Sequence, residues 1–210
     1  VLRRNGALAR VLPEIDSLFG VPQPRDHHPE GAVGTHTLMV LEKAATLSDD
    51  TRVRFAALLR DVGKGTTPQH EWPHHIAHEK RGVRHVKVLC QRLRIPRSHR
   101  DLALAVTEHH LLMHKLPGLR TTTVLKLLHA LDAFRNPANV EPFAIACQAN
   151  ARAPAGPKQP YPAAELLARY TEAAGAVDLK DLETSLPPGK ARQREARRRR
   201  LAAIAETRSM

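Results

Sequence analysis

Histidine and aspartate side chains that can bind a divalent metal ion occur at several points of the 210-residue sequence, which holds thirteen histidines. His74 and His78 have i,i+4 spacing, and so have His110 and His114, which places each pair on one face of a helix. These residue types therefore indicate a candidate metal site, although a single histidine is more commonly a surface or core residue.

Three further residues extend this set. His36 lies in the first turn of one predicted helix, and Asp61 lies at the end of the next. Asp132 shares an apolar stripe with Leu125 and Leu128, and a buried aspartate needs a cationic partner or a metal ion. An N-cap or salt-bridge role for Asp132 is the alternative.

The elements that must position these residues are helices. Apolar residues recur at helical spacing in nearly every segment, and no convincing alternating strand is present, so the sequence predicts an all-α fold. Four prolines between Pro154 and Pro162 indicate a linker before a last helical section. The predicted helices cover residues 35–47, 51–61, 82–95, 101–114, 124–134 and 140–150.

The composition is typical of a globular, soluble, cytoplasmic protein. Apolar residues make up 42% and charged residues 26% of the chain. No apolar run approaches the roughly 20 residues that cross a bilayer, and no signal peptide opens the sequence. Cys90 and Cys147 fall in apolar helical settings and are expected to be small core residues. Because residue 1 is Val, either the chain is a piece of a longer one or an alternative start codon was read literally.

The net charge of +12 indicates a polyanionic partner, with RNA the leading candidate. Residues 189–210 hold eight Lys or Arg against two Asp or Glu, which supplies half of that charge. Arg197, Arg198, Arg199 and Arg200 are therefore the predicted RNA-binding residues, and a solvated helix face is the alternative. Aromatic residues are only 3%, which favours phosphate contact over base stacking.

Several stretches resemble one family: "GTHTLMVLEKAATLSDDTRVRFAALLRDVGKGTTPQHEWPHHIAHEKRG", "LCQRLRIP" and "LLHALDAFRNP". They are similar to the HD domain of bacterial CCA-adding enzymes, which build the 3′ end of tRNA, and the resemblance runs to about Arg152. It implies a helical-body segment in residues 1–26, an HD-domain helical bundle in 27–152, a linker in 153–163 and a basic helical extension in 164–210. The family's nucleotidyltransferase head has no counterpart in this sequence.

The resemblance also implies a metal site, with one conspicuous departure. HD domains are named for an adjacent His-Asp pair that binds metal with an earlier His and a later Asp. His36, Asp61 and Asp132 match three ligands, but Arg60 takes the place of the pair's histidine. A guanidinium only donates hydrogen bonds and repels a cation. Because adjacent helical residues do not face each other, Asp132 is the expected partner of Arg60.

A second departure lies in "ACQANARAP", where the family tends to have acidic residues and this chain carries Gln148 and Asn150. Both departures reduce the negative charge that a cation would need.

Three hypotheses follow. In the first, the domain is a tRNA-binding scaffold with an impaired metal site and no cofactor. In the second it is a working phosphohydrolase for a phosphoester substrate, with Ni, Co, Mn or Mg as the metal and Asp61 and Arg60 as catalytic residues. In the third, the chain is part of a complete CCA-adding enzyme. The residues expected to replace the missing ligand or to contact the substrate phosphate are Lys64, His75, His78, His109 and His110.

Overall fold

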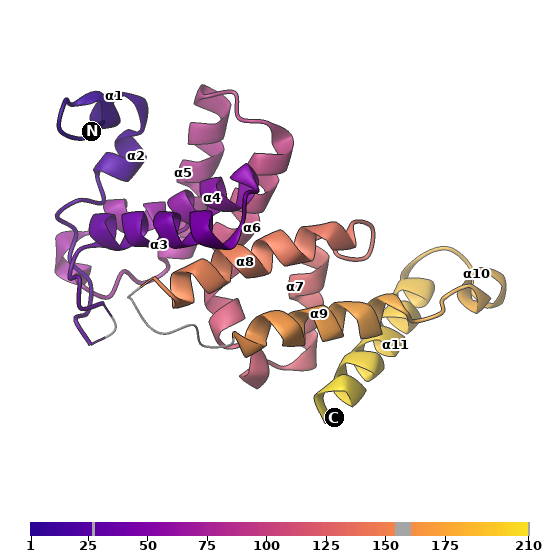
Figure 1. The fold of residues 1–210 in the computed structure, drawn as a ribbon. Helices are drawn as coiled ribbons and strands as arrows, with labels where there is room; N and C mark the ends of the chain where they lie inside the picture. The colour runs from indigo at the N-terminus through magenta and orange to yellow at the C-terminus, as the bar shows by residue number, and fades with distance from the viewer. Residues whose placement is uncertain (27, 154–160, 210) are drawn as a thin grey trace. The chain divides into compact units, whose positions relative to one another are not determined.

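The computed structural model describes residues 1–26, 28–153 and 161–209. Helices connected by loops and short 3₁₀ segments make up these residues, and no strand is present among them beyond one isolated bridge between Pro22 and Ala32 (Figure 1). The all-α prediction is confirmed. None of the described helices combines the length and the apolar character needed to cross a membrane.

The first of two compact units comprises residues 1–114 and 142–160. In this unit α4 packs against α3 and α6, and α5 packs against α6 and against the 3₁₀ segment that follows α4. Its core includes Val40, Leu59, Val86, Val106 and Phe143, all fully buried. The helices of this part are α1 (Ala7–Val11), α2 (Pro13–Asp16), α3 (Val33–Leu47), α4 (Thr51–Leu59), α5 (His78–Arg92), α6 (Arg97–His114) and α8 (Val140–Ala151), with 3₁₀ segments η1 (Val62–Thr66) and η2 (Gln69–Glu71).

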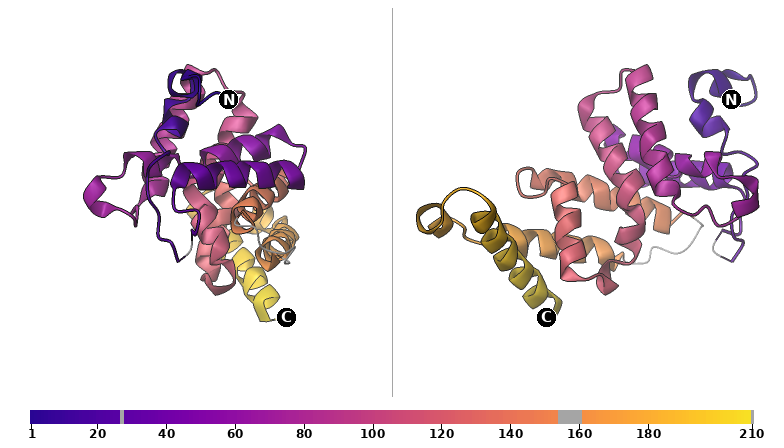
Figure 2. Two further views of the ribbon diagram at one scale, coloured as in Figure 1. Left: turned by 60° about the vertical axis from the view of Figure 1, so that its left-hand side comes forward. Right: turned by 180° about the vertical axis from the view of Figure 1, so that it is seen from behind.

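The second unit comprises residues 115–141 and 161–210. Its helices are α7 (Thr121–Ala130), α9 (Pro162–Gly175), α10 (Asp181–Ser185) and α11 (Lys190–Ser209), with 3₁₀ segments η3 (Leu116–Gly118) and η4 (Pro137–Asn139). Helix α11 packs on α7 and α9, and Ile204 in α11 is fully buried, so the basic end of the chain belongs to a packed unit. Figure 2 shows α11 from two further directions.

The two units interleave along the chain, whereas the sequence predicted consecutive domains. Residues 154–160 of the predicted linker lie outside the described residues. Cys90 and Cys147 are both free and buried, as expected of small core residues.

Candidate metal centre

Close backbone packing of three elements brings the central residues together. A Cβ atom on Gly63 of η1 would lie 2.5 Å from the backbone nitrogen of Gly82, and one on Gly82 of α5 would lie 2.6 Å from Cγ2 of Thr107 in α6. Only glycine permits these approaches. Because Asp61 precedes η1, and His78 and His110 lie one turn from the α5 and α6 contacts, their side chains converge.

Asp61 is the centre of this cluster and is 2% exposed. Its Oδ2 accepts hydrogen bonds from the guanidinium of Arg60 and lies 3.2 Å from Nζ of Lys64. Burial alone would raise the pKa of Asp61, but the charges of Arg60 and Lys64 outweigh it and hold that pKa well below its usual range. Asp61 is therefore ionised in its buried position.

Arg60 and Asp61 form an ion pair although they are adjacent in the sequence. The expectation that Arg60 pairs with Asp132 is therefore wrong. Helix α4 ends at Leu59, Arg60 is its C-cap, and Asp61 leaves the helical path at φ −106° and ψ 13°. The long side chain of Arg60 can then fold onto the carboxylate of the next residue. The argument from helix geometry fails because the helix has already ended.

His78 and His110 present lone pairs to the other oxygen of Asp61. Nδ1 of His78 lies 3.0 Å from the carbonyl oxygen of His75, and Nδ1 of His110 lies 3.0 Å from that of Val106. A carbonyl only accepts, so both Nδ1 atoms donate, and the neutral form of each ring has its lone pair on Nε2. Burial lowers the pKa of His110 to about 3, so its ring is neutral near pH 7.

These Nε2 atoms lie 3.3 Å and 3.7 Å from Asp61 Oδ1. Asp61 Oδ1 and His78 Nε2 are buried without a hydrogen-bond partner. Three acceptors that converge without a donor form a set able to hold a metal ion.

His36 lies in the first turn of α3 and contacts Asn150 of α8. His36 Nε2 is 3.0 Å from Asn150 Oδ1, and Asn150 Nδ2 is 2.7 Å from His114 Nε2. Asn150 therefore links two histidines through hydrogen bonds. From the sequence, position 150 was noted only because the family tends to have acidic residues in this segment. The contact between Asn150 and His36 was not predicted.

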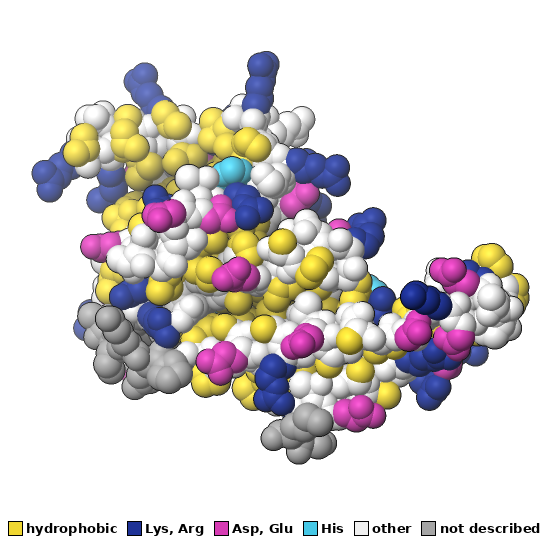
Figure 3. Space-filling model, turned by 45° about the vertical axis from the view of Figure 1, so that its right-hand side comes forward, with side chains coloured by type: hydrophobic (Ala, Val, Ile, Leu, Met, Phe, Trp, Pro, Cys, Tyr) yellow, Lys and Arg dark blue, Asp and Glu magenta, His cyan; other side chains and the backbone are white. Residues whose placement is uncertain are grey.

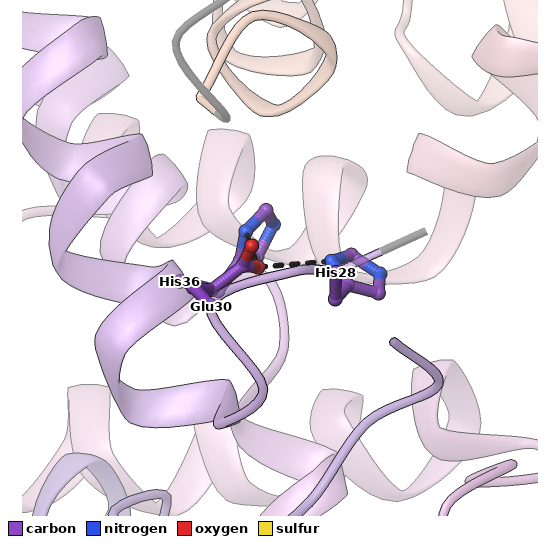
Figure 4. A group of neighbouring side chains, drawn as sticks. All are labelled: His28, Glu30 and His36. Atoms are coloured by element: carbon purple, nitrogen blue, oxygen red, sulfur yellow. Dashed lines mark hydrogen bonds and ion pairs between the residues drawn. The ribbon is translucent and has the colours of Figure 1, made fainter. Parts of the chain in front are cut away.

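Glu30 lies beside both His36 and His28. Its Oε1 lies 2.6 Å from His36 Nδ1 and 3.1 Å from His28 Nδ1, and its carboxylate points at the His28 ring in Figure 4. Because His36 Nε2 donates to Asn150 Oδ1, the Nδ1 atom of the neutral ring carries a lone pair, and it has no hydrogen-bond partner despite its short distance to Glu30. The three groups also lie close enough together to hold a metal ion themselves. His28 and Glu30 were missed because the loop that carries them shows no helical spacing.

The charge of Arg60 reaches most of the pocket. Burial and the positive charge of Arg60 lower the pKa of His36 to about 4, and the pKa of His114 is lowered for the same two reasons. Arg60 is 2% exposed, and its Nη1 has no hydrogen-bond partner. A buried cation thus lies among the groups that would bind a metal ion.

The role of Asp132 as the last metal ligand stays a prediction, because Asp132 belongs to the second unit and the cluster around Asp61 to the first. Asp132 follows α7 in the second unit, at φ 55°, and its side chain is 41% exposed. Its Oδ1 accepts a hydrogen bond from Arg135 at 2.7 Å. The apolar stripe of Leu125 and Leu128 does not continue to Asp132, because α7 ends at Ala130.

The other predicted residues divide into two groups. Lys64 contacts Asp61 and also donates to Gln23 at 3.1 Å, so it belongs to the pocket. His75 holds the loop before α5 through Pro22 O at 2.7 Å and Thr67 Oγ1 at 3.0 Å, which is a structural role. His109 is half-buried on α6 and is not among the grouped ligands of the described residues.

The four arginines predicted to bind RNA are not equivalent. Arg199 bonds to Asp181 and Glu195, Arg198 bonds to Glu195, and Arg200 lies 3.8 Å over the ring of Phe134. Only Arg197 of the four is exposed and has no ion pair within the described part of the chain. Acidic and basic side chains are correspondingly interleaved around α10 and α11 in Figure 3.

The class of protein follows from this fold and a comparison with known families. The HD domain family matches residues 33–136, a range that contains the cluster around Asp61. Residues 33–136 thus belong to the HD-domain family.

Multifunctional CCA proteins are similar to the chain over nearly all of its length. The protein from Nitrosococcus oceani is 51% identical over 205 residues, which cover 97% of this chain and 50% of that protein. The proteins from Alkalilimnicola ehrlichii and Vibrio cholerae are 54% and 46% identical over 84% and 97% of this chain, covering 43% and 51% of their own lengths. The chain thus spans about half the length of these relatives.

HD domains usually bind divalent metal ions, and the donor set of this chain fits one only in part. Asp61, His78 and His110 offer three converging ligand atoms. Residue 60 offers a cation in place of an imidazole, and Lys64 adds a second positive charge at Asp61.

Proposed function

We propose that this chain is the HD-domain and tRNA-binding part of a cytoplasmic bacterial CCA tRNA nucleotidyltransferase-like protein, with an HD metal site impaired by Arg60. The observation that carries the proposal is the buried ion pair of Arg60 and Asp61. The guanidinium supplies the positive charge that a metal ion would otherwise bring to this carboxylate. A buried ionised aspartate then has its counter-charge without a cofactor.

The affinity for RNA is proposed from charge. The net charge is +12, and the similarity to multifunctional CCA proteins covers the basic end of the chain. Lys and Arg neutralise phosphates and release counterions, so binding should weaken steeply as salt rises.

Two measurements test the proposal. Calorimetric titration with Ni²⁺, Mn²⁺ or Mg²⁺ should show no tight stoichiometric site, and a labelled tRNA transcript should bind with a strongly salt-dependent affinity. A tight site that is lost on Asp61→Asn would disprove the impairment. Failure to bind tRNA at 50 mM salt would disprove the RNA-binding role.

A metal-dependent phosphohydrolase is the second candidate, favoured by the unpartnered acceptors of Asp61 and His78 beside His110. These three residues would hold the ion, which would supply an activated water. The free Nη1 of Arg60 would donate to a substrate phosphoryl oxygen.

The test for this candidate is hydrolysis of 2′,3′-cyclic AMP and p-nitrophenyl phosphate with each of Ni²⁺, Co²⁺, Mn²⁺ and Mg²⁺. Turnover that is abolished by His110→Gln but kept by His109→Gln would establish it, because His109 lies outside the cluster. No turnover with any metal by the folded protein rejects it.

Nucleotidyl transfer would belong to the part of such proteins that this chain does not match. The open reading frame upstream of the codon for Val1 tests whether this sequence is joined to such a part.

A further inference from the structure

A row of basic side chains follows the outer face of α5. Lys80, Arg84, Lys87 and Arg94 are all exposed, and Gln91 lies between the last two. The spacings of four, three and four residues place Lys80, Arg84, Lys87 and Gln91 on one side of α5, opposite the buried residues Gly82, Val86 and Leu89, and Arg94 follows just after the end of the helix. We call Lys80, Arg84, Lys87 and Arg94 the α5 stripe.

The α5 stripe carries uncompensated charge. Within the described residues, none of its four cations has a carboxylate at ion-pair distance, and the only acidic residue in α5 is Glu79, beside His78. Arg198 and Arg199 of α11, in contrast, are bound to Glu195 and Asp181. The strongest sequence signal for RNA binding therefore lies on partly neutralised arginines, while the α5 stripe keeps its full charge.

The C-terminal end of the stripe opens into a hollow. Lys87, Gln91, Arg94 and Arg100 line it together with apolar atoms of Ile95 and Leu104. Arg100 is bonded to Asp101, so Lys87 and Arg94 are its two free cations. Donors that surround a hollow in this way suit a phosphate group.

Arg94 occupies a backbone position that favours glycine. It follows the end of α5 at φ 51°, and the next amide, Ile95 N, donates to Cys90 O at 2.9 Å, as in a glycine-type helix cap. A left-handed conformation is unfavourable for a residue with a Cβ atom. An arginine there adds to the stripe a charge that the helix cap itself does not require.

We infer that the α5 stripe and its terminal hollow bind the phosphodiester backbone of RNA, an inference that rests on the proposed tRNA binding. Lys80 and Lys87 are seven residues apart within α5, which corresponds to about 10 Å at the helical rise, and Arg94 lies beyond the end of the helix. Duplex nucleic acid carries one negative charge per ~1.7 Å of its axis, so a backbone laid along the stripe offers several phosphates to four cations. The low aromatic content of 3% agrees with backbone contact that does not read bases.

The test compares the 210-residue chain with the variant Lys80→Gln/Arg84→Gln/Lys87→Gln for binding to a fluorescent tRNA transcript from 50 to 200 mM salt. Each lost phosphate contact should reduce the slope of log K against log salt by roughly 0.9. If three contacts are lost, the tRNA affinity of the wild type should fall about 40-fold more than that of the variant between 50 and 200 mM salt. The matched control is Lys115→Gln/Lys126→Gln/Lys180→Gln, which removes three exposed lysines of the second unit and should leave the slope nearly unchanged.

Arg94→Gly separates binding from folding. It removes one stripe charge while placing glycine at the left-handed position, so thermal stability should hold or rise while tRNA affinity falls. Wild-type binding with equal slopes for the stripe variant and the wild type overturns the inference but leaves tRNA binding intact. An equal loss of slope in the control variant also overturns it, because net charge alone would then explain the effect. Absence of wild-type binding overturns the proposed function itself.

Discussion

Replacement of Arg60 by histidine should convert the pocket into a metal site. Two unit charges about 4 Å apart interact with roughly 4 kcal/mol at an effective dielectric constant near 20, so a divalent ion beside the guanidinium meets about 8 kcal/mol of repulsion. A good structural zinc site provides about 10–16 kcal/mol, so this repulsion removes most of the available binding free energy. Arg60→His removes this repulsion and adds an imidazole ligand. Recovery of even half of the 8 kcal/mol, or about 4 kcal/mol, corresponds to about a thousand-fold gain in metal affinity.

Thermal unfolding with and without metal gives the clearest signature. Without metal the variant should be less stable than the wild type by about 3 kcal/mol, because it loses one partner of a buried ion pair while Lys64 still contacts Asp61. For a chain of this size that loss lowers the thermal midpoint by roughly 6–12 °C. Ni²⁺ or Mn²⁺ at about 100 times its Kd should restore about 2.7 kcal/mol.

Two controls accompany this experiment. His109→Gln in the Arg60→His background should leave metal affinity unchanged, because His109 is not among the ligands grouped around Asp61. Asp61→Asn in the same background should abolish it. The reasoning is refuted if the wild type already shows a metal-dependent rise in its midpoint equal to that of Arg60→His.

Three further predictions concern pH, packing and the basic end. The pKa of buried His110 is lowered to about 3, so between pH 6.5 and 3 the unfolded chain binds a proton that the folded chain does not. The free energy of unfolding should therefore fall by about 2 kcal/mol from pH 7 to pH 5. In urea unfolding, the difference in free energy between these two pH values should be smaller by that amount for His110→Gln than for the wild type. Gly82→Ala should destabilise by about 1–3 kcal/mol despite the better helix propensity of alanine, because its Cβ would lie 2.6 Å from Thr107 Cγ2, and adding Thr107→Ser should recover most of the loss. Arg199→Gln should lower the thermal midpoint without changing the salt slope of tRNA binding, whereas Arg197→Gln should reduce that slope by roughly 0.9 without lowering the midpoint.

Periodicity was sufficient to predict the helical elements but not how they divide into units. The stripes in α3, α4, α6 and α8 and the helix of the basic end follow directly from apolar spacing. The grouping of residues 115–141 with 161–210 depends on which helix faces meet, and a single helix does not encode that information locally. The proline-rich stretch indicated a break in the chain but not which helices pack together after it.

The candidate site was predictable where ligands lie at helix ends and obscure where loops supply them. Asp61, His36, His78 and His110 were all identified from spacing and residue type. Asp132 was predicted as a ligand from its apolar stripe with Leu125 and Leu128 and from the family resemblance, but α7 ends at Ala130, before Asp132. Glu30, in an irregular loop, gave no periodic signal, and the contact of Asn150 with His36 joins residues 114 positions apart.

The charges in the pocket explain why the two departures from the HD pattern belong together. Asp61 and Glu30 contribute two negative charges and Arg60 and Lys64 two positive charges. His36 and His110, whose pKa values are lowered to about 4 and about 3, add none near pH 7, so these charges balance without an ion. With histidine at position 60 and an acid at position 150, the same pocket would hold three negative charges and one positive charge. That excess of two is the charge that one divalent cation neutralises. Arginine at position 60 with a carboxylate at position 150 would leave a net charge of minus one. Histidine at position 60 with asparagine at position 150 would also leave a net charge of minus one. Burial of an unbalanced charge is costly. Without an ion, arginine at position 60 alone or asparagine at position 150 alone would therefore destabilise the folded chain, whereas Arg60 and Asn150 together leave the charges balanced.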